Sequence, residues 1–265
     1  MKTFSIFIIL AFTSSVPATE IPFDKALEFP ATAYSLVAEK RVIWVGEMHG
    51  TKEAPELFLG LIKLVSANHI APPVVALEIP AKDQAVIDRY LVSGDDSLLR
   101  ASSAFNSEFK DGKSSEAMAR LLSALRGEKL AAVVCFDAVL ATSAQDRDTK
   151  MAEALLQATD RFPSSKLLVL SGSVHSRTVV GTAWDPKYRP AAFELSRSFA
   201  SLVSFIIGFE GGTAWYRTKD GFGEQKIIGT RWEGTANHYI VIKPEPIRGH
   251  NGVIFTRRLT GSPPW

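Results

Sequence analysis

Residues 41–53, which read RVIWVGEMHGTKE, hold the pattern on which the predicted fold rests. The first five residues form an apolar run of the length expected for a buried strand. After the turn, apolar residues recur at helical spacing and predict an amphipathic helix over 56–66. Gly46 and Gly50 let the chain turn sharply between the two elements, as many strand-to-helix junctions require. Such a turn also exposes backbone N–H groups that could bind an oxyanion.

The same alternation of strands and helices continues along the chain. Apolar runs without clean alternation are typical of parallel strands that are covered on both faces, and strand–helix alternation favours βαβ units. The predicted fold is therefore α/β, with three layers: a mostly parallel central sheet, antiparallel late strands in that sheet, and helices on both faces. The further predicted strands are 74–79, 130–136, 166–170, 202–209, 212–217 and 238–243, and the further predicted helices are 24–29, 82–91, 115–125 and 148–159.

Titratable side chains stand where the predicted parallel strands end. Ligands of an open parallel sheet bind beyond the carboxyl ends of its strands, so these side chains should meet at one edge. A single such residue is more often a structural histidine or a glutamate at a helix N-terminus. Several together indicate paired carboxylates and imidazoles for general acid–base chemistry. The candidate catalytic residues are Glu47, His49, Glu78 and His175, with Glu53 and Asp137 as supporting residues.

The segment Asp146-Arg147-Asp148 allows two interpretations. Asp146 or Asp148 could cap a helix and place acidic charge in its first turn. Alternatively, Arg147 and Asp148 support the site, with the guanidinium fixing a carboxylate or a substrate anion. Both interpretations stay open. Ser115 is interpreted as a helix cap, and Cys135, the only cysteine, as a small buried hydrophobic residue that cannot form an intramolecular disulfide.

Composition narrows the class of partner. The 265 residues carry a net charge of only +2 and no Lys/Arg cluster, so nucleic acid is not an expected partner. The chain lacks the serine-hydrolase elbow G-x-S-x-G, the zinc motif H-E-x-x-H, C-x-x-C, and the nucleotide motifs G-x-G-x-x-G and P-loop. A small-molecule substrate is the remaining expectation.

The N-terminus predicts export. Lys2 precedes an apolar run over 4–13, and Val16-Pro17-Ala18 offers small residues for cleavage. This order matches a secretory signal, and the run is too short to span a bilayer. We therefore expect a signal peptide over 1–18, a single α/β domain over 19–265, and a periplasmic or secreted protein with no stable membrane insertion after signal removal.

Four separated motifs resemble the erythromycin esterase-like family, within the superfamily of the ChaN haem-uptake lipoproteins and the Tiki/TraB proteins. The resemblance covers about residues 40 to 200, and it rests on residues 46–53, Leu77-Glu78, Asp146-Arg147-Asp148 with Met151-Ala152, and His175. It implies an α/β fold with the site at the strand ends, and a hydrolytic centre made of Glu47, His49, Glu78 and His175. The chain departs from the antibiotic esterases because it is shorter, its first-motif Glu and His are separated by one residue only, and it lacks the long helical insertion expected around a macrolide pocket. A macrolide is therefore not the expected substrate.

Three functions follow as hypotheses. In a metal-free hydrolase of an ester or related acyl bond, His49 acts as the general base, Glu47 or Glu78 orients it, and His175 polarises the carbonyl or protonates the leaving group. In a metal-dependent hydrolase or protease of the Tiki type, the same residues hold zinc or manganese. In a haem or ligand carrier of the ChaN type, a His or Tyr ligates the iron. The sequence favours the first, without a cofactor, and keeps a divalent metal or haem as alternatives.

Overall fold

The structure, a computed structural model, describes residues 20–23, 28–109, 111–219, 221–231 and 236–265. The predicted signal peptide over 1–18 lies outside these residues, and so does most of the short helix predicted at 24–29. The first described helix is the 3-10 helix η1 (Ala31–Leu36), which leads into the first buried strand. Within the described part of the chain, no helix is both long and apolar enough to cross a membrane.

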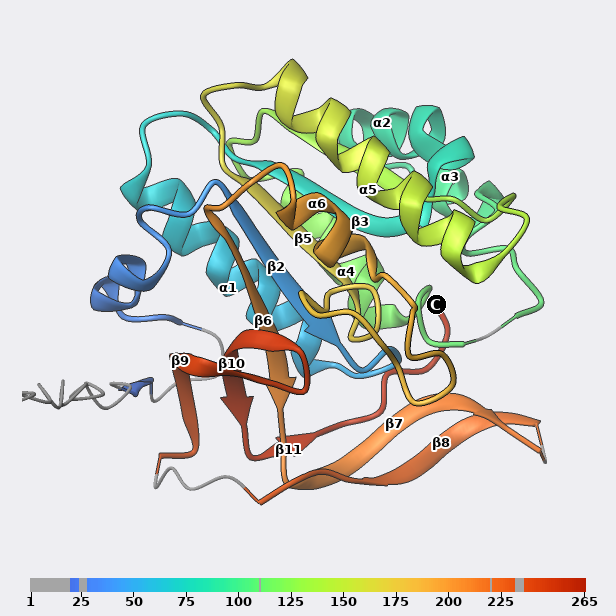
Figure 1. The fold of residues 1–265 in the computed structure, drawn as a ribbon. Helices are drawn as coiled ribbons and strands as arrows, with labels where there is room; N and C mark the ends of the chain where they lie inside the picture. Colours follow the sequence, from blue (N-terminus) through green and yellow to red (C-terminus); the bar gives the residue numbers. More distant parts are fainter. Residues whose placement is uncertain (1–19, 24–27, 110, 220, 232–235) are drawn as a thin grey trace, which may run out of the picture.

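A central eight-stranded sheet confirms the predicted α/β fold (Figure 1). Its strand order is β1-β9-β10-β6-β2-β5-β3-β4, and the neighbours from β10 to β4 all pair in parallel. Antiparallel pairing begins at β9, which lies between β10 and β1. The bounds are β1 Ile21–Pro22, β2 Val42–Glu47, β3 Val74–Pro80, β4 Ala132–Asp137, β5 Leu167–Gly172, β6 Leu202–Gly208, β9 His238–Ile247 and β10 His250–Thr256.

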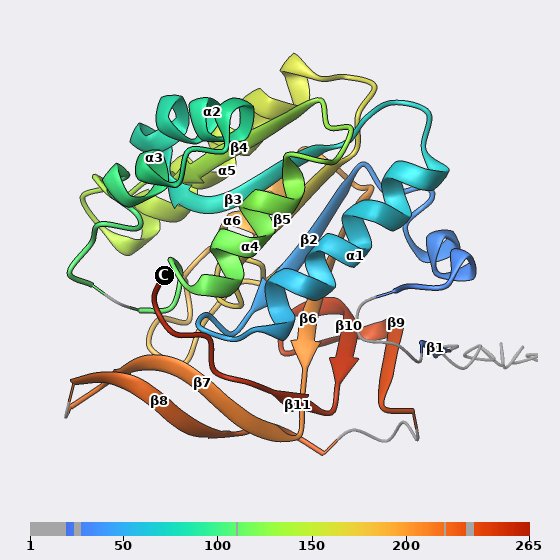
Figure 2. The ribbon, with the colours of Figure 1, turned by 180° about the vertical axis from the view of Figure 1, so that it is seen from behind.

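Successive residues of each buried strand belong to different hydrophobic cores, because strand side chains alternate between the two faces of a sheet. In β2, Ile43 and Val45 pack in the core beneath α1 (Glu53–Asn68) and α4 (Glu116–Leu125). Val42 and Trp44 pack in the core beneath α5 (Ala144–Arg161) and α6 (Ala191–Ser196). Figures 1 and 2 show these helix pairs on opposite faces of the sheet, which gives the three predicted layers.

The outer edge of the sheet, strand β4, is covered by a side chain of α2 (Gln84–Ser93). The Gln84 side chain donates to the carbonyl oxygen of Val133 (2.9 Å) and accepts from the Cys135 N–H (2.7 Å). The amide thus occupies backbone groups that an edge strand otherwise leaves open. Cys135 is buried as predicted, and burial raises the pKa of its thiol. Two short helices, η2 (Ala81–Asp83) and α3 (Asp96–Ala101), flank α2 along the chain.

One predicted strand in the last third of the chain lies in a different sheet from the one expected. The strand predicted at 212–217 does not join the central sheet: it is β7 (Gly211–Thr218), which pairs with β8 (Gly221–Ile228) and β11 (Arg258–Leu259) in a separate three-stranded sheet. Both edges of β6, the preceding strand, are already paired with β2 and β10, so the chain leaves the central sheet after β6. Figure 1 shows the small sheet crossing below the carboxyl ends of β2 and β6.

Candidate active site

Most of the predicted site residues meet at the carboxyl edge of the central sheet. Glu47 ends β2, Glu78 lies near the end of β3, Asp137 ends β4, and His175 follows β5 after a short turn. The strands β2, β5, β3 and β4 are consecutive neighbours, so residues more than a hundred positions apart in sequence come together. The structure gathers Glu47, His49, Glu78, Asp137, Arg147, Asp148 and His175 in one cluster.

Glu78 is the centre of this cluster. Its Oε2 accepts from the Gly172 N–H (2.7 Å), and its Oε1 accepts from Arg147 Nη2 (2.8 Å). Both imidazoles approach the same carboxylate, with Nε2 of His49 at 3.6 Å and Nε2 of His175 at 3.8 Å. Burial alone raises the pKa of Glu78, but the cations around it, among them His49, Lys113 and Arg147, outweigh burial and lower the pKa below its usual value. The carboxylate is therefore ionised at neutral pH.

His49 lies between two carboxylates. Its Nδ1 is 2.9 Å from Glu47 Oε1, and its Nε2 faces Glu78 Oε2. A carboxylate can only accept, so the arrangement favours a proton on both ring nitrogens. Burial lowers the pKa of His49, but Glu78 and Glu47 together reverse that effect and raise the pKa to about 9. His49 is thus held as an imidazolium.

His175 has different partners from His49, and they favour one ring proton instead of two. Its Nδ1 lies 2.6 Å from Oδ1 of Asp148, a fully buried carboxylate that also accepts from the Ala191 N–H (2.8 Å). Its Nε2 lies 3.3 Å from Arg147 Nη1. A guanidinium can only donate, so this contact assigns the accepting role to Nε2 and the proton to Nδ1. The lone pair of His175 therefore points into the site.

Arg147 connects the carboxylates, and its segment shows features of both interpretations: Asp146 places acidic charge in the first turn of α5, while Arg147 and Asp148 contact the cluster. Its Nε donates to Asp137 Oδ1 (2.7 Å), beside the bond from Nη2 to Glu78. Burial lowers the pKa of the guanidinium, but these two carboxylates more than compensate and raise it. The cap of α5 is Ser143, which precedes the predicted start. Arg147 and Asp148 therefore point into the site instead of capping the helix.

Lys113 belongs to the cluster but was not among the predicted residues. Its Nζ lies 3.7 Å from Glu78 Oε1, 3.7 Å from Asp137 Oδ2 and 3.5 Å from Asp111 Oδ2. The preceding Gly112 has a φ of 92°, and a side chain there would collide with the backbone of Gly50. The sequence marks a turn at Gly112, but nothing in it indicates that the turn packs against the His49 loop.

Glu53 lies apart from the cluster. Its Oε2 accepts from the Thr260 N–H (2.7 Å), and the neighbouring Lys52 N–H donates to the Thr260 carbonyl (2.8 Å). The C-terminal segment also binds the His49 loop directly, because Ser262 N–H donates to Gly50 O (2.8 Å). The Glu53 side chain thus links the segment around Thr260 to the start of α1.

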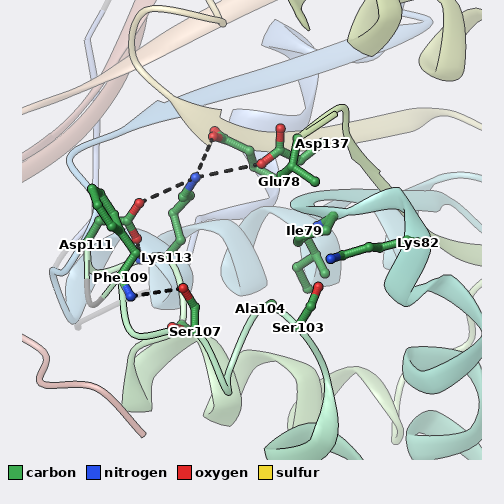
Figure 3. A pocket seen from close by; sticks show the side chains of 13 residues that line it. Glu78, Ile79, Lys82, Ser103, Ala104, Ser107, Phe109, Asp111, Lys113 and Asp137 are labelled. Carbon is green, nitrogen blue, oxygen red and sulfur yellow. Dashed lines mark hydrogen bonds and ion pairs between the residues drawn. The ribbon is translucent and has the colours of Figure 1, made fainter. Parts of the chain in front are cut away.

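A cavity of about 290 Å³ opens beside Glu78. Figure 3 shows Lys113 reaching toward Glu78 and Asp137 from one side, while Lys82 extends toward the cavity from the other. One part of the cavity wall is apolar. The two imidazoles do not line the cavity, so Glu78, Asp137 and Lys113 form the boundary between the cavity and the histidines. The lining residues are Glu78, Ile79, Pro80, Lys82, Ser103, Ala104, Ser107, Phe109, Asp111, Lys113, Ser114, Asp137 and Val139.

The donor set fits a divalent metal poorly. Among the described residues, no group of three or more His, Cys, Asp or Glu side chains is arranged to hold an ion. Glu78 and Asp137 already face the guanidinium of Arg147 and the ammonium of Lys113, which repel a further cation.

Comparison with known proteins gives structural matches only. No family model matches the chain, and no curated protein sequence does so either. A mutant of the erythromycin esterase EreC in its open conformation superposes with a TM-score of 0.66 at 11% identity, covering 89% of this chain and 96% of that one. A succinoglycan biosynthesis protein gives a TM-score of 0.72 at 8% identity, covering 93% and 96%. A Bacillus cereus protein gives 0.62 at 10% identity, also covering 93% and 96%.

These matches confirm the resemblance in fold that the sequence motifs indicated. The chain has the three-layer α/β fold of an erythromycin esterase over nearly its whole described length. At such low identity the likeness extends to the fold alone, so the chemistry depends on the residues at the strand ends.

Proposed function

We propose that the protein hydrolyses an ester or a related acyl bond without a metal, and that its two histidines divide the proton transfers. The observation that carries this proposal is the pair of imidazoles facing one carboxylate, Glu78, with opposite hydrogen-bond partners. Esterase chemistry needs both a base to activate water and an acid for the leaving group. The EreC fold and the motif resemblance add support for an esterase-like hydrolase.

His175 is the general base in this proposal. Its Nδ1–H is held by buried Asp148, as an orienting carboxylate holds a catalytic histidine, and its Nε2 lone pair faces the site. In the resting structure Arg147 Nη1 faces Nε2 at 3.3 Å, so the proposal requires a water molecule to displace this donor from the Nε2 lone pair. His175 takes a proton from that water, and the resulting hydroxide attacks the acyl carbon.

His49 is the general acid. Held as an imidazolium by Glu47 and Glu78, it carries a proton that it can give to the departing alkoxide. Solvent returns that proton, and His175 releases its own, so the site recovers its starting state after each hydrolysis. This assignment exchanges the roles expected from sequence, where His49 was the base. The reason is electrostatic: a base flanked by two carboxylates is already protonated.

Glu78 and Arg147 hold the two imidazoles in place. Glu78 is fixed by the Gly172 N–H and the guanidinium, so its charge stays between the rings. Arg147 in turn is fixed by Asp137. Because these groups are already ordered before substrate binds, the main rearrangement needed is the exchange of the Arg147 contact at His175 Nε2 for water.

The test is hydrolysis of a panel of small aryl esters by the purified protein, with and without a chelator. We expect activity that survives chelation and falls about 100-fold or more in both His49→Asn and His175→Asn. His69→Asn is the matched control, because His69 contacts the carbonyl of Ser164 far from the site. Activity lost on chelation and restored by zinc or manganese would replace this proposal with the metal-dependent one. Full activity in both site variants would refute the assignment.

We also propose that the mature protein acts outside the cytoplasm, on the strength of the signal-like residues before Glu20. Mass determination of the protein recovered after expression with its natural N-terminus should show loss of about the first 18 residues. An intact N-terminus would contradict this part of the proposal.

A further inference from the structure

Within the described part of the chain, Lys113 has donor capacity that no close hydrogen bond uses. Its Nζ lies 3.5 to 3.7 Å from three carboxylates, whereas hydrogen bonds from nitrogen to oxygen span about 2.7–3.2 Å. The ammonium is thus held in place by charge without being closely bonded to any of them. Burial lowers the pKa of Lys113, but Glu78, Asp111 and Asp137 more than offset that effect and raise it. The group therefore stays charged at neutral pH.

Lys113 lies at the boundary between the cavity and the histidines. Figure 3 shows that Lys113 lines the cavity together with Glu78. The two histidines do not line the cavity, and their Nε2 atoms lie 3.6 and 3.8 Å from the Glu78 carboxylate. A substrate whose hydrocarbon part occupies the cavity must extend past Glu78 for its acyl carbon to reach the histidines, and its carbonyl group then lies at this boundary beside Lys113. The apolar wall beside it, which includes Ile79 and Val139, can take the hydrocarbon part of the substrate.

We propose that Lys113 binds the carbonyl oxygen of the acyl substrate and stabilises the oxyanion that forms when water attacks. This inference rests on the proposed hydrolase function and adds a catalytic residue to it. When the water oxygen bonds to the acyl carbon, the π electrons of the carbonyl move to its oxygen. Lys113 donates to that negative oxygen, and the electrons return when the bond to the leaving alkoxide breaks. A preorganised cation at a partly buried site is well suited to this role.

The local backbone explains how Lys113 reaches the boundary. Gly112 packs against Gly50, the residue after His49, and Trp215 N–H donates to Gly50 O (2.8 Å). The Lys113 loop is also tied to the C-terminus, since Trp265 N–H donates to Ser114 O (3.2 Å). The ammonium and the His49 imidazolium are therefore carried by two loops in direct contact.

The first test compares hydrolysis by wild type, Lys113→Met and Lys63→Met. Lys63 is an exposed lysine of α1, so its loss controls for removal of one positive charge. We expect kcat to fall about 100- to 1000-fold in Lys113→Met, as for loss of an oxyanion donor, and to be unchanged in Lys63→Met. Lys113 also lowers the pKa of His49, so the basic limb of the rate profile should move to higher pH in Lys113→Met. Unchanged kcat in a folded Lys113→Met protein overturns the inference.

The second test does not depend on hydrolysis. Phenylphosphonate, whose charged oxygens imitate the oxyanion, is titrated calorimetrically into the same full-length proteins. We expect binding by wild type and Lys63→Met, and at least about tenfold weaker binding by Lys113→Met, since one charge-assisted hydrogen bond is lost. Lys113-dependent binding by a protein that hydrolyses no ester would refute the hydrolase but keep Lys113 as the oxyanion-binding residue. Absent binding, or equal binding by all three proteins, overturns the inference.

Discussion

The Nδ1 atom of His175 lies 2.6 Å from Oδ1 of Asp148, a carboxylate with no exposed surface. Asp148 comes from α5 and His175 from the turn after β5, so the contact joins a covering helix to the edge of the sheet. It fixes both the ring orientation and the proton position of His175. A buried carboxylate at this distance orients the ring for proton abstraction at Nε2.

Replacing Asp148 tests that contact. Asp148→Asn retains an oxygen for the Ala191 N–H but removes the charge that holds the Nδ1 proton, so kcat for ester hydrolysis should fall about 100- to 10,000-fold. Asp146→Asn is the control, because among the described residues the Asp146 carboxylate contacts Thr142 and Lys150 and no member of the cluster. Circular dichroism establishes that both variants fold. Equal activity in the two variants would show that Asp148 does not act through His175.

The protonation state of His49 sets the pH dependence of the hydrolysis rate. Its pKa is raised to about 9, so the general acid is protonated below that value and is lost as pH rises through it. The rate of hydrolysis should therefore fall above about pH 9. Glu47 contributes to raising this pKa, so Glu47→Gln should move the falling limb to lower pH. Rate profiles of wild type and Glu47→Gln check this, and an identical limb, or one shifted upward, contradicts it.

Arg147 should matter for stability as well as for activity. Arg147→Met leaves Glu78 and Asp137 buried without their closest cation, at a cost of about 3–5 kcal/mol in the free energy of unfolding. Urea unfolding of wild type and variant measures this difference. As a control, Arg120→Met removes an exposed ion pair with Glu116 and should cost less than about 1 kcal/mol. Similar losses in the two variants would indicate that Arg147 does not balance buried charge.

Gly112 should tolerate no side chain. At its φ of 92°, Gly112→Ala is strained by about 1–3 kcal/mol, and the added methyl group collides with Gly50. The collision should separate the two loops and lower activity through Lys113 and His49. Gly127→Ala is the matched control, since its methyl group makes only an ordinary contact with Ala124 O at 3.5 Å. Thermal unfolding and kcat measured on both variants check the prediction, and a harmless Gly112→Ala change would contradict it.

The strands were predictable from the sequence where helices cover both faces of the sheet. Strands such as 74–79 and 166–170 are apolar because helices cover both faces of the sheet, and they appear as β3 and β5 with similar bounds. The prediction was less complete for the last third. Helix α6 has only six residues, and β8 carries mostly exposed or partly exposed side chains, so neither has a strong pattern.

The candidate site was predictable as far as topology dictates it. Parallel neighbouring strands must bring Glu47, Glu78 and Asp137 to one edge. Lys113 depends on the packing of one loop against another, which leaves no periodic signal in the sequence. The roles of the histidines depend on distances of a few ångströms to Glu47, Glu78 and Asp148, and these exist only in the folded chain.

The protonation states of the two imidazoles decide which histidine can act as the base. Nitrogen-15 NMR of the histidine-labelled protein separates doubly protonated rings from each neutral tautomer, and single His→Asn variants assign the five histidines. We expect that, at neutral pH, His49 carries a proton on both nitrogens and His175 carries one on Nδ1 alone. A neutral His49 beside a doubly protonated His175 would contradict it and return the base to His49.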